Sequence, residues 1–272
     1  MNLLHKCGVA ALLSLVCITG LQAQESPPAA ALRRLLEGNA RFAADKPRIG
    51  AVGADRRKEL VKEHKPFAVV LTCADARVVP ALLFDAGLGD LFELAVAGNI
   101  TDKAILGSIE YAIEHLHAPL IVVLGHDSCG AVTAAVNGAK LPGDLGWLIK
   151  QVKVGDNLPA DKDAKLAAAV RNNVRAAAKD LEERSNLIHE KIKDKKVNIV
   201  TAVYSLKTGN IEWLSHQEKK KPADVEKKPA VEKKPAAPSS NTAAILPPAI
   251  ETNYVEVRRF PRLRSFFERL RE

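Results

Sequence analysis

Three side chains that bind soft metal ions stand in two short segments of the sequence. Cys73 lies within residues 72–77, and His126 and Cys129 lie three positions apart within residues 124–130. Two thiolates and one imidazole form a borderline-soft ligand set that suits Zn²⁺, and three protein ligands leave the fourth tetrahedral position open. The sequence therefore predicts a zinc site that serves catalysis, because a structural site would need a fourth protein ligand.

A carboxylate and a guanidinium, Asp75 and Arg77, follow the first cysteine at intervals of two residues. An arginine can hold a carboxylate through two parallel hydrogen bonds, which keep the carboxylate ionised and fix its direction. Beside a metal, such a carboxylate can orient a zinc-bound water, or it can turn and bind the metal itself. The sequence therefore predicts that Asp75, held by Arg77, acts beside the metal in one of these two ways.

The cysteines also allow an interpretation without metal. Of the four cysteines in the sequence, Cys7 and Cys17 precede the expected mature chain, which leaves Cys73 and Cys129. Two thiols in an oxidising compartment usually form a disulfide, and the chain would then be a non-enzymatic binding protein. A disulfide gives no role to the histidine or to the charged pair, so the zinc site is the favoured hypothesis.

Short apolar runs rich in β-branched residues are expected to form the strands that position these side chains. The runs are 67–72, 91–97, 119–125 and 197–204. Helical patterns alternate with them at 81–85, 104–117, 130–137 and 164–194, and the last is long enough for two helices. This alternation is typical of an α/β fold with a mostly parallel central sheet flanked by helices. Both metal-binding segments directly follow strands, so we expect the site at the carboxyl ends of parallel strands.

Two further elements are expected at the edges of this domain. Residues 29–63 have a helical pattern and predict an N-terminal helical arm, in which Gly38 and Asn39 indicate a stop or a bend. Residues 207–210 are typical of a hairpin turn, so residues 211–214 are expected to add an antiparallel edge strand.

The first residues of the chain are typical of a signal peptide. Residues 1–23 contain Lys6 in a short polar start, the apolar run 9–21 and the small residue Ala23 before a polar stretch. The apolar run is shorter than the roughly 20 residues of a membrane-spanning helix. We therefore expect an exported protein, periplasmic or secreted, with a catalytic domain over residues 24–216.

The last part of the chain has a different composition. Residues 217–250 are rich in Lys, Pro and Ala and repeat Val-Glu-Lys-Lys-Pro-Ala, which predicts an extended linker. Residues 251–272 place six arginines among apolar residues, and they either contact an anionic surface or pack back on the domain. Much of the formal net charge of +8 lies in these two segments, so we expect no nucleic-acid binding by the folded body.

The pattern Cys-x-Asp-x-Arg at 73–77, followed by His-x-x-Cys at 126–129, resembles the site motif of the β-class carbonic anhydrases. The resemblance covers about residues 30–215 and extends well beyond the ligands. The similar stretches are 38–42, 73–80, 84–85, 89–92, 97–100, 109–112, 120–132, 202–204 and 208–209.

The resemblance implies a lyase that reversibly hydrates carbon dioxide to bicarbonate and a proton. It implies Cys73, His126 and Cys129 as the zinc ligands, with Asp75 and Arg77 as the catalytic pair. It also implies a homodimer or a homotetramer. A relative with the same metal cage could instead hydrolyse carbonyl sulfide or carbon disulfide, because the cage suits any small linear electrophile.

The sequence departs from the family pattern at two places. Ala74 and Ala76 stand where the family often has serine, which removes hydroxyl groups from the loop but leaves the ligands. Some members close the site in concert with a bicarbonate pocket that uses a tryptophan and an arginine, and Val70 and Ala95 stand at those positions. We therefore expect Asp75 to pair with Arg77, and to be a zinc ligand only in a closed form of the site.

The ligand set also predicts the pH dependence of the reaction. Zinc lowers the pKa of bound water from about 15.7 to about 7 in the carbonic anhydrases that hold it by three histidines. Two thiolates donate more negative charge to the metal than neutral imidazoles do. We therefore expect a less acidic water in this site and an activity that rises toward alkaline pH.

Overall fold

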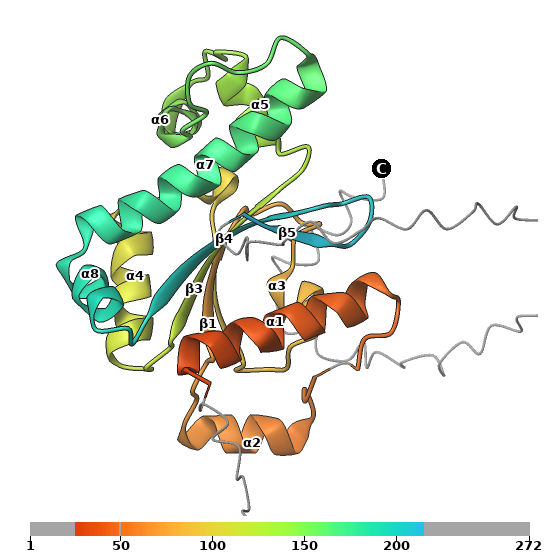
Figure 1. Ribbon diagram of the computed structural model, residues 1–272, viewed down its shortest axis with the longest axis vertical. Helices are drawn as coiled ribbons and strands as arrows, with labels where there is room; N and C mark the ends of the chain where they lie inside the picture. The colour runs from red at the N-terminus through yellow and green to blue at the C-terminus, as the bar shows by residue number, and fades with distance from the viewer. Residues whose placement is uncertain (1–24, 49, 215–272) are drawn as a thin grey trace, which may run out of the picture. The chain divides into compact units, whose positions relative to one another are not determined.

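The computed structural model describes residues 25–48 and 50–214 (Figure 1). The predicted signal peptide at 1–23, the linker at 217–250 and the basic segment at 251–272 lie outside the described residues. Within the described part of the chain, no helix has the length and apolar character needed to cross a membrane.

A five-stranded sheet forms the centre of the described domain, with the strand order β2-β1-β3-β4-β5. Its strands are β1 (Ala68–Thr72), β2 (Leu91–Ala95), β3 (Leu120–His126), β4 (Asn198–Tyr204) and β5 (Ile211–Trp213). The first four strands pair in parallel, and β5 pairs antiparallel with β4, so that Ile211 faces Tyr204. The predicted α/β fold with a mostly parallel sheet and an antiparallel edge strand is confirmed.

Eight α-helices and one short 3₁₀ helix complete the described domain. They are α1 (Pro27–Ala43), α2 (Ala54–Lys62), α3 (Pro80–Leu83), η1 (Ala97–Asn99), α4 (Lys103–Glu114), α5 (Gly130–Val136), α6 (Gly143–Gln151), α7 (Lys162–Arg184) and α8 (Asn186–Lys193). The predicted division of residues 164–194 into two helices is confirmed. Ser185 separates them, because its side chain accepts the backbone N–H of Ile188 and so caps α8.

The two faces of the sheet are covered by different helices. Neighbouring residues of a strand point to opposite faces. Val70 and Val122 belong to the core formed with α1 and α3, whereas Val69 and Val123 belong to the core formed with α4, α7 and α8. All four valines are fully buried. Burial on both faces explains why the central strands are continuous apolar runs in the sequence rather than alternating ones.

The helical arm differs from its prediction at Gly38 and Asn39. Helix α1 continues through both residues to Ala43, so the predicted stop or bend is wrong. Both residues serve contacts with the rest of the fold instead. A Cβ on Gly38 would lie 1.9 Å from the carbonyl oxygen of Phe84, so only glycine allows α1 to come this close. The Asn39 amide accepts the backbone N–H of Ile211 at 2.9 Å and so holds the edge strand β5.

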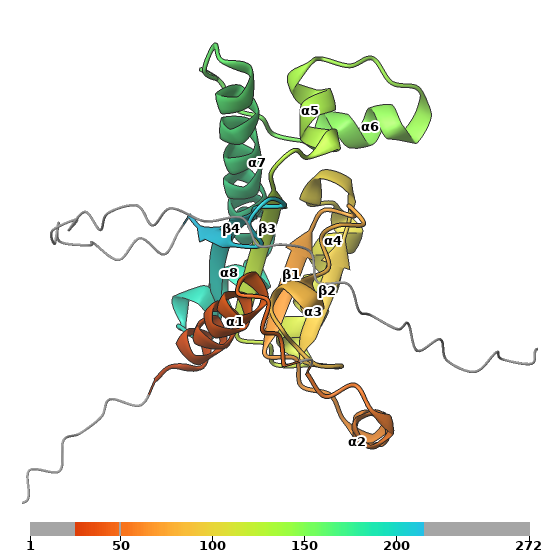
Figure 2. The same cartoon turned by 90° about the vertical axis from the view of Figure 1, so that its right-hand side faces the viewer.

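The strand order changes direction at the two strands that carry the predicted site residues. The chain passes from β1 to β2 on one side and then returns to β3 on the other side of β1. Ligands of open α/β sheets bind outside the carboxyl ends of the strands at such a change of direction. Figures 1 and 2 show α5 and α6 beyond this end of the sheet, beside α7. The strands β1 and β3 both end there, which brings residues 73 and 126 to the same edge.

Candidate metal centre

The local backbone directs three side chains toward one point. Cys73 follows the last residue of β1, and His126 is the last residue of β3. Ser128 has a positive φ of 54°, which turns the chain between the histidine and Cys129. Cys129 is the N-cap of α5, where the backbone N–H groups of the first helical turn favour a thiolate.

The ligand atoms of these three residues form a compact, buried group. The two sulfurs and the imidazole nitrogen all lie within 4.8 Å of one another. Cys73, His126 and Cys129 have exposed fractions of only 5%, 0% and 1%. The two Sγ atoms are 3.9 Å apart and both cysteines are free. This separation is far longer than the S–S bond of about 2.05 Å, so the alternative of a Cys73–Cys129 disulfide is not what the structure contains.

The imidazole presents a lone pair to this group. His126 Nδ1 lies 2.8 Å from the backbone oxygen of Asp127, and a carbonyl can only accept a hydrogen bond, so Nδ1 carries the proton. Nε2 is then the unprotonated nitrogen of the neutral ring. Nε2 is buried without a hydrogen-bond partner among the described residues, which costs free energy unless a cation binds it.

The two thiols share a proton when no cation is near. Hydrogen bonding from the Cys129 thiol lowers the pKa of Cys73 to about 4. The same hydrogen bond raises the pKa of Cys129, and burial raises it further. A divalent metal placed between the sulfurs removes this need for a shared proton, because it stabilises both thiolates.

The charged pair lies beside this group of ligands. Arg77 donates through Nε to Asp75 Oδ1 at 2.9 Å and through Nη2 to Oδ2 at 2.8 Å, and its backbone N–H donates to Oδ1 at 3.0 Å. These bonds to the Arg77 side chain and backbone hold the pKa of the Asp75 carboxyl well below its usual range. Asp75 Oδ2 lies 3.8 Å from His126 Nε2, so the carboxylate faces the ligands.

The three ligands fit a zinc ion. Two sulfurs, each about 2.3 Å from a tetrahedral zinc, would lie roughly 3.8 Å apart, which agrees with the observed 3.9 Å. The unpaired Nε2 supplies a third donor atom. Among the described residues, the group able to hold a metal contains these three and not Asp75, whose oxygens are bound to Arg77.

Sequence comparisons identify the family of the chain. The sequence profile of the carbonic anhydrases matches residues 68–211, which is more than half of the chain. Carbonic anhydrase 2 of Mycobacterium tuberculosis is 40% identical over 194 residues, a match that covers 70% of this chain and 94% of the relative. The chain belongs to the β-carbonic anhydrase family. The resemblance that the motifs indicated is thereby confirmed.

Solved β-carbonic anhydrases share the fold. The enzyme of Coccomyxa, solved in complex with acetazolamide, has 25% identity and a TM-score of 0.54, covering 67% of this chain and 86% of the other. A tetrameric β-carbonic anhydrase of Sordaria macrospora has 24% identity and a TM-score of 0.55, covering 68% and 98%. As in other β-carbonic anhydrases, the metal of this site is zinc.

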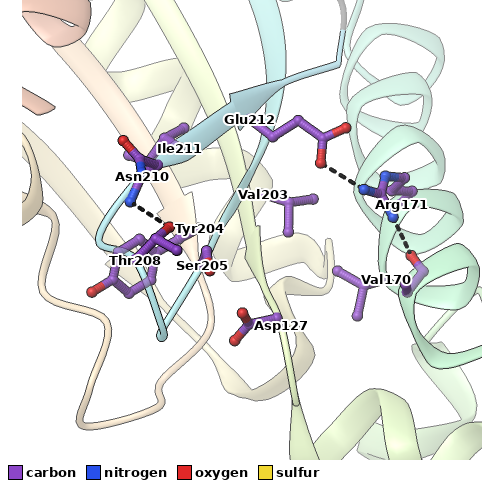
Figure 3. A pocket seen from close by; sticks show the side chains of 11 residues that line it. Asp127, Val170, Arg171, Val203, Tyr204, Ser205, Thr208, Asn210, Ile211 and Glu212 are labelled. Atoms are coloured by element: carbon purple, nitrogen blue, oxygen red, sulfur yellow. Dashed lines mark hydrogen bonds and ion pairs between the residues drawn. The ribbon is translucent and has the colours of Figure 1, made fainter. Parts of the chain in front are cut away.

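A cavity next to this carbonic anhydrase site contains none of the three ligands. It has a volume of about 390 Å³ and lies between α7 and the β4–β5 hairpin (Figure 3). Arg171 and Glu212 form an ion pair of 2.6 Å at its wall. Asp127, directly after the ligand His126, also lines it, and both of its carboxylate oxygens accept the backbone N–H of Leu206 at 3.2 Å. Asp127 therefore ties the loop that carries two ligands to the hairpin.

The sequence motifs contain the three ligands but do not indicate two residues that support them. Asp127 stands inside the His-x-x-Cys motif, yet its bond to the hairpin depends on the pairing of β3 with β4. Gly98 donates its backbone N–H to Cys73 Sγ at 3.3 Å. The stretch 97–100 is similar to the family, but its motif does not indicate that the glycine contacts a ligand.

Proposed function

We propose that this protein catalyses the reversible hydration of carbon dioxide to bicarbonate and a proton, with zinc held by Cys73, His126 and Cys129. The observation that carries the proposal is the buried group of two sulfurs and one unpaired imidazole nitrogen in a chain of this family. Zinc, when bound there, acts as a Lewis acid that makes a nucleophilic oxygen available near neutral pH.

The role that we propose for Asp75 is to orient the attacking oxygen. Its carboxylate is ionised, lies 3.8 Å from His126 Nε2 and has an exposed side-chain fraction of 18%, so it stands between the ligands and solvent. An ionised carboxylate accepts a hydrogen bond from the attacking group, which points a lone pair of that group at the carbon of carbon dioxide.

The role that we propose for Arg77 is to keep Asp75 in this position. Its two side-chain hydrogen bonds occupy both carboxylate oxygens. A closed form, in which Asp75 binds the metal, requires these bonds to break. We therefore propose that the open form prevails near neutral pH.

A metal analysis and a carbon dioxide hydration assay on the same preparation test the proposal. Wild-type protein should contain one zinc per chain and hydrate carbon dioxide in a stopped-flow assay with a pH indicator. Asp75→Asn should retain zinc and lose roughly 10- to 100-fold in kcat/KM. Asp180→Asn is the matched control, because Asp180 on α7 also contacts an arginine, Arg184 at 3.4 Å, and touches none of the three ligands. Its carboxylate also accepts a hydrogen bond from Thr101 Oγ1 at 2.9 Å.

Two outcomes of this experiment would overturn the proposal. A zinc-loaded protein that is inactive on carbon dioxide but hydrolyses carbonyl sulfide or carbon disulfide would assign the site to that other reaction. Equal losses in Asp75→Asn and Asp180→Asn would remove the specific role of Asp75.

We further propose that the protein is a homodimer or a homotetramer. The Sordaria macrospora relative is tetrameric. In the described chain β2 is an edge strand, and Leu82 and Leu88 near it are 62% and 45% exposed. An uncovered edge strand beside exposed apolar side chains favours association. Light scattering after size-exclusion chromatography should give a mass of two or four chains, and a monomer at micromolar concentration would contradict this.

We also propose that the protein is exported after cleavage near residue 23. The support is the polar start with Lys6 followed by the apolar run 9–21. N-terminal sequencing of the protein from its native cells should find a chain that begins near Gln24 in the periplasmic or secreted fraction. Full-length protein in the cytosolic fraction would contradict export.

Residues 251–272 are proposed to contact an anionic surface. Six arginines stand there among apolar side chains. The full mature chain should sediment with vesicles of anionic lipid and not with neutral ones, and a variant without residues 217–272 should stay in solution with both. Equal sedimentation of the two chains would refute this contact.

A further inference from the structure

A backbone N–H group of η1 contacts the sulfur of the ligand Cys73. Gly98 donates to Cys73 Sγ at 3.3 Å from η1, where its φ is 71°. Glycine adopts this conformation without the strain that a Cβ would cause. A Cβ at this position would lie 2.9 Å from Val152 Cγ2 and 3.2 Å from Ala131 Cβ. The absence of a side chain therefore lets the loop come close enough to donate to the sulfur.

A buried side-chain amide on α7 binds the backbone oxygen of the same glycine. Asn173 is only 2% exposed, and its Nδ2 donates to the backbone oxygen of Gly98 at 2.8 Å. Its Oδ1 accepts the backbone N–H of Lys153 at 2.9 Å. One side chain thus ties η1 and the segment after α6 to the long helix.

The place of Asn173 on α7 is otherwise apolar. The other buried residues of this helix are Ala169, Val170, Val174, Ala177 and Leu181. A polar side chain on such a face costs free energy unless its polar atoms are bonded. Both polar atoms of Asn173 are bonded to backbone groups of the loops around the site. These contacts are therefore a sufficient reason for an amide at this position.

We propose that Asn173 is a positioning residue of the metal centre, which fixes Gly98 so that its N–H stays on the sulfur of Cys73. A hydrogen bond to a thiolate withdraws negative charge from the sulfur, so the sulfur donates less charge to a bound metal. Without Asn173 the loop would shift and the sulfur of Cys73 would donate more charge to a zinc ion held there, which would then polarise a bound water less. The inference rests on the proposed zinc site and concerns how that site is tuned.

Two substitutions and a matched control separate this role from general loosening of the loops. Asn173→Asp keeps an acceptor for Lys153 but loses the donor to Gly98. Asn173→Ser also loses the donor to Gly98, because the short side chain cannot reach it, and it leaves room for a water. Asn172→Ser is the control, since Asn172 Nδ2 donates to the oxygen of Val154 at 2.9 Å, in the segment that Asn173 also holds, without contacting Gly98.

Two quantities are measured. The first is the absorption band of sulfur-to-cobalt charge transfer in the Co²⁺-substituted protein, and the second is the pH profile of kcat/KM in the zinc protein. The band should move to longer wavelength in both Asn173 variants, because a sulfur without its hydrogen bond gives up an electron more easily. The pH midpoint of kcat/KM should rise by about 0.5 unit, which is roughly a threefold loss below the midpoint with little change on the alkaline plateau. Asn172→Ser should match the wild type in both readouts.

The outcomes that overturn the inference are distinct from those that overturn the function. An unshifted band in a folded Asn173 variant, or an equal shift in Asn172→Ser, would remove the positioning role while the wild type still binds zinc and hydrates carbon dioxide. A wild-type protein without zinc or without hydration activity would instead remove the proposed function.

Discussion

The contact between α7 and the strand that carries His126 can be tested by adding one methyl group. In Gly125→Ala, the new Cβ would lie 2.5 Å from Val174 Cγ2 and 3.2 Å from Val170 Cγ1. Val174 is fully buried, and a β-branched side chain has few rotamers with which to avoid the clash. Such overpacking costs typically 1–3 kcal/mol, so we expect the free energy of unfolding to fall by about 2 kcal/mol.

A second substitution on α7 should relieve this clash. Val174→Ala alone removes two buried methyl groups at about 0.8 kcal/mol each, and with the cavity that remains the loss is about 2 kcal/mol. If the two effects were independent, the double variant would lose about 4 kcal/mol. Because the new methyl of residue 125 fills part of the space left at residue 174, we expect a loss of only about 2.5 kcal/mol, a favourable coupling of about 1.5 kcal/mol.

Denaturant unfolding of the zinc-loaded proteins at one chain concentration measures these differences. Gly107→Ala is the control, because Gly107 lies in α4 and a Cβ added there would meet nothing within 4 Å, so alanine should stabilise the helix by about 0.5–1 kcal/mol. Gly125→Ala should also lower kcat/KM, since the neighbouring residue is a ligand. Additive losses in the double variant, or a neutral Gly125→Ala, would refute the packing argument.

Three further predictions concern the site itself. Arg77→Ala should lower kcat/KM by roughly 10- to 100-fold, and Arg77→Lys by less, because lysine keeps the charge but not the two parallel hydrogen bonds to Asp75. The control Arg171→Ala, which breaks the ion pair with Glu212, should leave kcat/KM unchanged. Equal effects of Arg77→Ala and Arg171→Ala would contradict this. Competition with a chelator should show that zinc affinity rises with pH, by up to about tenfold per pH unit for each proton that zinc binding releases. The reason is that the raised pKa of Cys129 keeps its thiol protonated in the metal-free chain. An affinity independent of pH would be inconsistent with two thiolate ligands. Asp127→Ala should lower the free energy of unfolding by about 1–3 kcal/mol, because the N–H of Leu206 loses its partner. Asp127→Asn should keep most of the stability, because its amide oxygen still accepts this N–H. An unchanged free energy of unfolding in Asp127→Ala would show that the contact to the hairpin is unimportant.

The sequence was sufficient to predict the strands and the ligand group because both depend on local patterns. The central strands are buried on both faces, so they are continuous apolar runs such as residues 68–72. Each ligand segment directly follows such a run. Parallel strands bring their carboxyl ends to one edge of the sheet, so the meeting of Cys73 with His126 and Cys129 follows from the fold class.

The contacts between distant elements could not be predicted in this way. Gly38 looks like the end of a helix in the sequence, but it is a glycine because the oxygen of Phe84 lies where its side chain would be. Asn173 looks like one more polar residue of a charged helix, since nothing in the sequence shows that Gly98 will lie against it. Such roles depend on how α1 and α7 pack on the sheet, which local patterns do not determine.

The proposed activity requires one zinc ion held by two cysteines and one histidine. X-ray absorption at the zinc edge of the purified, active protein measures this directly. We predict one zinc per chain with two sulfur atoms at about 2.3 Å and two nitrogen or oxygen atoms at about 2.0–2.2 Å. A zinc ion with fewer than two sulfur neighbours, or a protein that contains no zinc and has a disulfide between its two cysteines, would contradict this metal centre.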